Sequence, residues 1–186
     1  MNVRIAIALF LFATTTSLFA DANEDLLYAI NTNRPDRLTA AIRAGANVNL
    51  KNSIDVPVLS LAVTNADQIE LVRILIQNGA NVNARSSQGV TALHNAAWNK
   101  TVAIIGLLLD ARANIDAKDN KGVTPLMSGA RKCDVPTVDL LVKRGAKVNL
   151  RDNRGETAWD YAKSQCNYRT VSMPIKKILE QAGFKE

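Results

Sequence analysis

Histidine, cysteine and aromatic residues are scarce in this sequence of 186 residues. It contains 1 His and 2 Cys, and aromatic residues make up 5% of it. A zinc site made from His and Cys side chains alone needs four ligands, more than the sequence offers. The sequence also has no glycine-rich phosphate-binding loop with its lysine, no His-Glu-x-x-His motif and no calcium-binding loop. These absences argue against a metalloenzyme, and we expect neither a metal nor another cofactor.

Basic residues outnumber acidic residues by 23 to 17, which gives a formal net charge of +6 at pH 7. This surplus favours acidic partners, but it is too small to identify a dedicated nucleic-acid-binding protein. The hydrophobic fraction of 47% and the charged fraction of 22% are typical of one folded unit of this length.

Residues 1–20 have the pattern of a secretory signal: a short start with Arg4, an apolar run and then small polar residues. The alternative is an uncleaved membrane anchor. Only 16 uncharged residues separate Arg4 from Asp21, fewer than the roughly 20 that a spanning helix needs. Cleavage after Ala20 and cleavage after Ala22 both fit, and we prefer Ala20. We therefore expect a periplasmic or secreted protein without a membrane segment after cleavage.

The rest of the sequence repeats with a period of about 33 residues. One marker, Gly-Ala-Asn-Val-Asn or a variant of it, starts at Gly45, Gly79, Arg112 and Gly145. A second marker, Thr-Pro-Leu-Met or a variant of it, starts at Thr91, Thr124 and Thr157. Two independent markers with one period seldom arise by chance, so the pattern predicts a stack of similar units.

Each unit is predicted to contain two helices. An Ala-rich stretch at 92–97 is followed by a bulkier apolar run at 104–109, both with helical spacing. Segments between units, such as 116–122, have the Asn, Asp and Gly content of tight turns. One helix pair cannot bury its own apolar face, whereas three or more stacked pairs form a continuous core.

At these markers the sequence resembles the ankyrin repeat family, whose unit of about 33 residues carries a Thr-Pro-Leu-His-x-Ala signature. Thr124-Pro-Leu-Met127 and Thr91-Ala-Leu-His94 are the matching strings here. The resemblance implies an all-α solenoid of about five helix-turn-helix units with degenerate end caps, occupying residues 21–186. The expected units are approximately 22–51, 52–85, 86–118, 119–151 and 152–186.

Cys133 and Cys166 are separated by one repeat period. An exported protein meets an oxidising compartment, where two thiols tend to pair. Equivalent points on stacked helices lie about 8 to 10 Å apart, beyond the roughly 7 Å limit for bridged Cα atoms. Five extra residues around 165–169 could let the chain fold back toward Cys133. We expect a disulfide, with two free thiols as the alternative.

Catalysis could be imagined with His94 as a base and Cys133 as a nucleophile. The resemblance instead places His94 in the signature, where the family's histidine is structural and bonds to neighbouring backbone. No further triad context is present. We therefore expect that the protein is not an enzyme.

The family usually binds its targets on the concave side, through the turns and the first helix of each unit. This implies a partner-binding surface made of Lys51, Arg85, Trp98, Asn99, Lys118, Lys121, Arg131, Lys132, Arg151 and Arg154. Stacking is expected to align four of these cations, one from each turn, in a column: Lys51, Arg85, Lys118 and Arg151. Such a surface has the Arg and aromatic content of interface hot spots.

The basic charge is concentrated in one part of the chain. Residues 21–84 contain 5 basic and 7 acidic residues, whereas residues 85–186 contain 17 basic and 10 acidic residues. We expect a monomeric, non-catalytic module that binds an acidic protein surface, as an inhibitor, immunity partner or accessory factor of an exported enzyme. Two alternatives stay open: a secreted effector that engages a partner outside the cell, and nucleic-acid binding, which would weaken steeply with salt.

Overall fold

The computed structural model describes residues 21–64, 66–167 and 172–185. Within these ranges the regular structure is helical, apart from one isolated antiparallel bridge between Lys51 and Pro57. The predicted all-α class is therefore confirmed. The predicted signal at residues 1–20 lies outside the described residues and stays a prediction.

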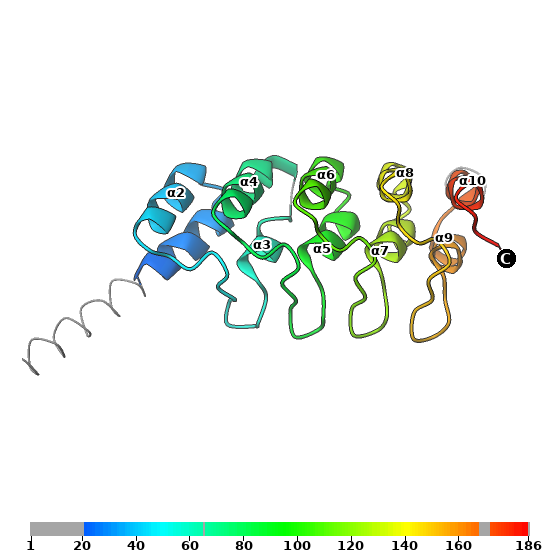
Figure 1. The fold of residues 1–186 in the computed structure, drawn as a ribbon, viewed down its shortest axis with the longest axis horizontal. Coiled ribbons are helices and arrows are strands. Elements are labelled where there is room, and N and C mark those ends of the chain that lie inside the picture. The colour runs from blue at the N-terminus through cyan, green and yellow to red at the C-terminus, as the bar shows by residue number, and fades with distance from the viewer. Residues whose placement is uncertain (1–20, 65, 168–171, 186) are drawn as a thin grey trace, which may run out of the picture.

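The helices form two layers, and the turns that link successive helix pairs all project from the same side (Figure 1). The inner layer, beside the turns, contains a helix at 21–31 and then α3 (Val58–Leu61), α5 (Ala92–Trp98), α7 (Pro125–Arg131) and α9 (Ala158–Gln165). The outer layer contains α2 (Pro35–Arg43), α4 (Ile69–Gln77), α6 (Val102–Asp110), α8 (Val135–Lys143) and α10 (Met173–Gln181). A short 3-10 helix, η1 (Ala66–Gln68), precedes α4.

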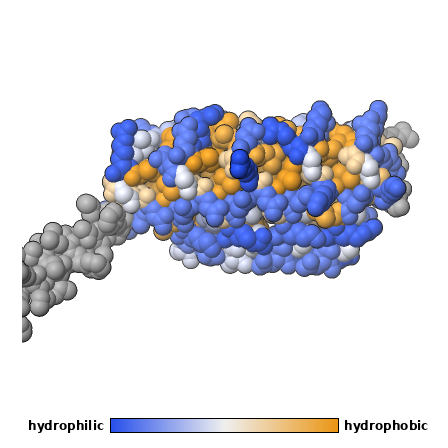
Figure 2. Space-filling model, in the orientation of Figure 1, coloured by the Kyte–Doolittle hydropathy of each residue, from blue (hydrophilic) through white to orange (hydrophobic). Residues whose placement is uncertain are grey.

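The core lies between the two layers and continues from unit to unit. Ala96 and Ala97 of α5 and Ile104, Ile105 and Leu108 of α6 are all 0% exposed. Small residues on the inner helix let neighbouring helices approach, while each buried branched side chain of the outer helix contributes about 1.5 to 3 kcal/mol. Figure 2 shows the turn layer as a largely hydrophilic band, with more apolar surface over the helices.

The threonine that opens the second sequence marker caps an inner helix. Thr124 Oγ1 accepts a hydrogen bond from the Met127 amide, and Thr157 Oγ1 accepts one from the Asp160 amide, both at 3.3 Å. Such a side chain satisfies one of the free amides of the first helical turn and is worth about 1 kcal/mol. The marker repeats because α5, α7 and α9 each begin at this threonine.

The second Asn of the first marker joins one unit to the next. Asn49 Oδ1 accepts from the Asn81 amide, and Asn83 Oδ1 accepts from the Asn114 amide, both at 2.7 Å. The same side chains donate through Nδ2 to the carbonyls of Gly79 at 3.3 Å and Arg112 at 3.4 Å. The repeated asparagine is thus explained by an inter-unit hydrogen-bond ladder.

At the next junction, the ladder contains a charged residue instead of asparagine. Asp116 stands where the other units have Asn, and its Oδ1 accepts from the Lys147 amide at 2.9 Å. Its other oxygen, Oδ2, lies 4.0 Å from Lys147 Nζ. Lys147 itself replaces the first Asn of the marker, so the two departures from the repeat face each other.

The tips of three neighbouring turns are also bonded together. The Asn120 amide donates to the Gln88 carbonyl at 3.0 Å, and the Asn153 amide donates to the Lys121 carbonyl at 2.9 Å. Gly122 has φ +78°, and a Cβ there would lie 2.6 Å from Asn153 Oδ1. Glycine is required at this position because both the backbone conformation and the close approach of the next turn exclude a side chain.

Cys133 and Cys166 lie at disulfide-bonding distance, with their Cα atoms 5.5 Å apart. The wider separation expected from helix packing was wrong for these residues because they do not occupy equivalent points on their helices. Cys133 follows the C-cap of α7 and has φ +58°, whereas Cys166 is itself the C-cap of α9, with extended backbone. Helix α9 thus extends one residue further into its repeat than α7 does, and the two backbones differ where the cysteines lie.

Candidate functional site

A groove runs between the turns and the inner helices, and three hollows follow one another along its described part. The first hollow, of about 330 Å³ between the second and third units, is lined by Ile54, Val56, Ser60, Ser86, Ser87, Gln88, Val90 and Asn95. The second, of about 260 Å³, is lined by Val90, His94, Asn95, Trp98, Asp119, Lys121, Val123, Ser128 and Arg131. The third, of about 460 Å³, is lined by Asn120, Lys121, Val123, Arg131, Asp152, Asn153, Arg154 and Tyr161.

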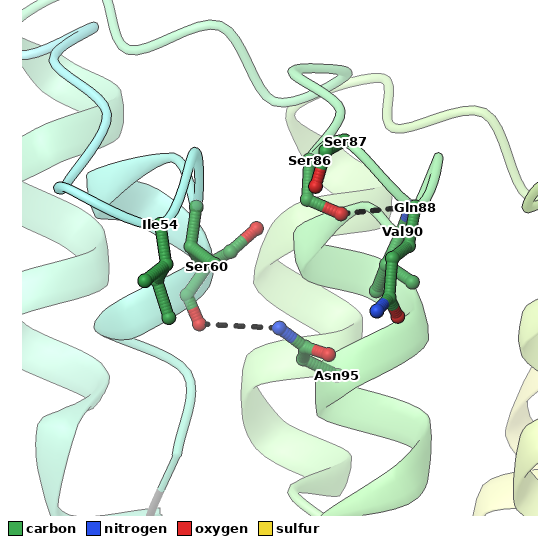
Figure 3. A pocket seen from close by; sticks show the side chains of 8 residues that line it. Ile54, Ser60, Ser86, Ser87, Gln88, Val90 and Asn95 are labelled. Carbon is green, nitrogen blue, oxygen red and sulfur yellow. Dashed lines mark hydrogen bonds between the residues drawn. The ribbon is translucent and has the colours of Figure 1, made fainter.

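The first hollow is uncharged and partly apolar. Ile54 stands at one rim with 70% of its surface exposed, and Val90 stands opposite it (Figure 3). At the floor, Asn95 Nδ2 donates to the Ser60 carbonyl at 3.4 Å and so ties α5 to α3 (Figure 3). The described side chains that line this hollow offer hydroxyl, amide and apolar groups, which suit a neutral ligand group.

A cationic and aromatic cluster spans the second and third hollows. The Arg131 guanidinium, at the end of α7, lies 5.4 Å from the centre of the Trp98 ring and 5.9 Å from that of Tyr161. Lys132 Nζ lies 4.6 Å from the centre of the Trp98 ring. Trp98 keeps 41% of its surface exposed. Contacts of a cation with an aromatic face are worth about 0.5 to 2 kcal/mol each, so Trp98 and Tyr161 restrain Arg131.

Arg131 and Lys132 have no oxygen acceptor among the described residues, although both are restrained by aromatic rings. The side chain of Lys121, between the second and third hollows, also makes no hydrogen bond or ion pair with the residues that the structure describes. Their N–H groups are therefore free to bind an external anion. These three residues form what we term the open cation set.

Arg154 differs because its charge is already compensated. Its guanidinium bonds to Glu156, lies 3.5 Å from the carboxylate of Asp152, and donates to the hydroxyl of Tyr161 at 3.0 Å. The hydroxyl of Tyr161 donates to Asp152 Oδ2 at 2.8 Å. Burial raises the pKa of Asp152, but the amide of Glu156, Tyr161 and Arg154 outweigh it, and the pKa stays below its usual value. Asp152 is thus an ionised anchor that fixes Tyr161.

Three of the four cations in the predicted turn column are bonded to turn residues, two within their own turn and Lys118 to the next turn. Lys51 Nζ pairs with Asp55 at 2.9 Å, Lys118 Nζ donates to the Arg151 carbonyl at 2.8 Å, and Arg151 donates to the Gly155 carbonyl at 2.7 Å. None of these three cations lines the three hollows in the part of the chain that the structure describes. They remain exposed, as does Arg85.

Asn99 is used between units rather than left free. Its Nδ2 donates to the Val63 carbonyl at 3.3 Å, so the side chain ties the end of α5 to the second unit. Of the ten predicted binding residues, the structure gathers Trp98, Lys121, Arg131, Lys132 and Arg154 around the second and third hollows.

Tyr161 was not among the predicted site residues, although its ring flanks Arg131. Asn95, Ser128 and Tyr161 follow one another at the repeat period and all line the groove. The prediction followed the neighbouring series, which contains Trp98 and Arg131. The repeat period could have identified Tyr161, because the series that contains it lies three positions before the series of Trp98 and Arg131.

His94 is 3% exposed, and its two ring nitrogens have neighbours. Nδ1 accepts from the Thr91 amide at 3.2 Å, and Nε2 lies 3.0 Å from the Val123 carbonyl. Burial lowers the pKa of His94 below 6.5. The histidine therefore caps α5 and ties its unit to the next turn as a neutral group.

The helices within the described residues are all too short or too polar to span a bilayer. In the same ranges, no group of three or more His, Cys, Asp and Glu side chains could hold a metal ion.

Paired helices, projecting turns and a groove along one side define a helical repeat scaffold. A family model for ankyrin repeats (3 copies) matches residues 26–119, and a model for a single ankyrin repeat matches residues 121–153. The chain belongs to the ankyrin repeat family. Ankyrin repeat domains are typically non-catalytic modules that bind other proteins. No match to the chain was found among curated proteins.

Proposed function

We propose that the protein is an exported, non-catalytic module that holds an acidic surface of a partner protein in its groove. The observation that carries the proposal is the open cation set, Lys121, Arg131 and Lys132, beside Trp98 and Tyr161. Arg and aromatic residues in a concave site are typical of binding hot spots. A cation that is restrained before binding loses little conformational freedom when it meets a carboxylate.

The distribution of charge along the chain supports an acidic partner. Residues 85–186 have 17 basic and 10 acidic residues, and they supply the lining of the second and third hollows. A positive groove attracts a negative partner over several ångströms and accelerates its association. We extend the proposed repeat domain to residues 21–186, with α9 and α10 as the last helix pair.

Export and role are proposed from less direct observations. The sequence pattern at residues 1–20 favours a cleaved signal, and the Cys133–Cys166 pair suits an oxidising compartment. We favour a periplasmic inhibitor, immunity or accessory role for a monomer over release as an effector. Cell fractionation separates these roles, because an effector accumulates in the medium.

The proposal is tested by affinity capture from the native periplasm with the mature chain as bait. In the groove variant, Lys121, Arg131 and Lys132 are all changed to Glu. In the control variant, three exposed cations of the outer helices that make no ion pair with the described residues are changed to Glu instead: Arg37, Arg43 and Lys177. Both triple variants lower the net charge equally and break no ion pair among the described residues.

We expect the wild type and the control variant to retain the same acidic protein and the groove variant to lose it. Retention by all three proteins would refute the groove as the binding surface. Loss with a third variant, in which Lys51, Lys118 and Arg151 are changed to Glu, would add the turn column to the site. Retention of nucleic acid that falls steeply with salt would favour the alternative function.

A further inference from the structure

The two ends of the groove differ in chemistry. The first hollow is bordered by Ile54, Val56 and Val90 and has no charged lining residue among those described. The second and third hollows meet at Lys121 and Arg131. A ligand that lies along the groove therefore meets an uncharged, partly apolar site first and a cationic site afterwards.

Arg131 is arranged to recognise a carboxylate rather than diffuse negative charge. The rings of Trp98 and Tyr161 contact its guanidinium at 5.4 and 5.9 Å. Among the described residues no oxygen occupies its N–H groups. A guanidinium held in place by aromatic rings presents a planar fork of donors, which matches the two oxygens of a carboxylate.

The distance between the two sites matches a short extended peptide. The first hollow lies between units two and three, and Arg131 lies in unit four, so about one and a half repeats separate them. With helices packed about 8 to 10 Å apart, this distance is about 12 to 15 Å. An extended chain rises about 3.3 Å per residue, so about four to five residues span it.

We propose that the groove recognises an extended segment of the partner that has an apolar side chain in the first hollow and a carboxylate on Arg131, about four to five residues away. This inference rests on the proposed function, because it names the part of an acidic partner that the groove reads. The hollows, of about 330, 260 and 460 Å³ in a row, accommodate side chains one after another along such a segment.

Synthetic peptides of Gly and Ser with one Leu and one Glu test the proposal. The separation of Leu and Glu is set at two, four, five or eight residues, in both chain directions. Matched peptides carry Gln in place of Glu or Ser in place of Leu. Binding to the mature, oxidised chain is followed by NMR at the Trp98 indole and the Ile54 methyl groups, and the titrations give the Kd.

We expect a peptide with a separation of four or five residues to bind at least tenfold more tightly than its Gln counterpart and than peptides with the other separations. Arg131→Gln should abolish the preference for Glu over Gln, and Ile54→Ser should abolish the preference for Leu over Ser. Both side chains are exposed, so circular dichroism should show an unchanged fold.

Affinity that is independent of separation, or no measurable binding of any peptide at millimolar concentration, would overturn the extended-segment inference. In that case, capture that is still lost with the groove variant would leave the proposed function standing with a folded acidic surface as the ligand. If capture is also unaffected by the groove variant, both proposals fail. The Arg131→Lys variant is a second check of the preference for Glu over Gln. It keeps the charge but removes the planar fork, so this preference should weaken.

Discussion

A disulfide between Cys133 and Cys166, which lie at bonding distance, is expected to stabilise the C-terminal end of the solenoid. The two residues are separated by 33 positions. In the chain-entropy treatment, closing a loop of that length in the unfolded chain is worth about 3.7 kcal/mol at 25 °C. Changing both residues to Ser should therefore lower the free energy of unfolding of the last two units by about that amount.

Backbone conformation offers a way to separate this effect from local strain. Cys133 has φ +58°, a left-handed conformation that costs a residue with a side chain about 1 to 2 kcal/mol. Glycine adopts it freely. The double variant with Cys133→Gly and Cys166→Ser should thus be about 1 kcal/mol more stable than the double Ser variant, although neither has the bridge.

Urea unfolding followed by tryptophan fluorescence, in a Trp98→Phe background that leaves Trp159 as the one tryptophan, and by circular dichroism measures both effects. Trp159, in α9, is 3% exposed and reports on the last unit, whereas circular dichroism reports on all helices. Because repeat arrays unfold unit by unit when a junction is weakened, the two signals should separate in the bridgeless variants and coincide in the oxidised wild type. The reduced wild type is the control without a substitution.

Unfolding free energies that agree within about 1 kcal/mol between the oxidised wild type and the double Ser variant would refute this reasoning, since the loop term is several times larger. Equal stability of the Gly and Ser variants would instead refute the assignment of strain to the backbone of residue 133.

The other predictions concern His94, the ladder and the turns. Burial holds the pKa of His94 below its usual value, so the unfolded chain binds the proton first as the pH falls. The free energy of unfolding should therefore decrease as the pH drops from 7 to 5, and His94→Gln should flatten that slope in urea unfolding. Asn83→Ala removes the acceptor of the Asn114 amide, 2.7 Å away, and should cost about 1 to 2 kcal/mol, whereas Asn83→Asp should recover part of it. Gly122→Ala would place a Cβ 2.6 Å from Asn153 Oδ1 and should speed hydrogen exchange at the Asn153 amide; unchanged exchange would contradict the close approach of the turns.

The period of the markers predicted the helical pairs because each marker residue has a local, repeated task. Thr124 caps a helix and Asn83 bridges two units, and both tasks depend on positions that recur once in every repeat. The resemblance to the ankyrin repeat family, carried over at the repeat period, implied that Trp98 and Arg131 lie on the binding side. Periodicity was therefore sufficient for the stacked helix pairs, and the resemblance supplied part of the candidate site.

The pattern could not predict which turn cations are hydrogen-bonded and which are free. Whether a turn cation is free depends on its rotamer and on nearby backbone carbonyls, as with Arg151, which bonds to the Gly155 carbonyl. The Cα distance between the cysteines likewise depended on where α9 ends, one residue beyond the repeat. These details vary between units, so a pattern common to all units does not contain them.

The facing pair of Asp116 and Lys147 makes the order of the units matter. Asp116 accepts from the Lys147 amide at 2.9 Å and its other oxygen lies 4.0 Å from the lysine Nζ, while asparagine fills the corresponding role at neighbouring junctions. A gene rearrangement that swapped or duplicated one of these two modules would set an unmatched acid or base against a neutral amide. The junction between Asp116 and Lys147 is thus complementary in charge, and artificial arrays built from these repeat units should assemble best when the two units stay adjacent.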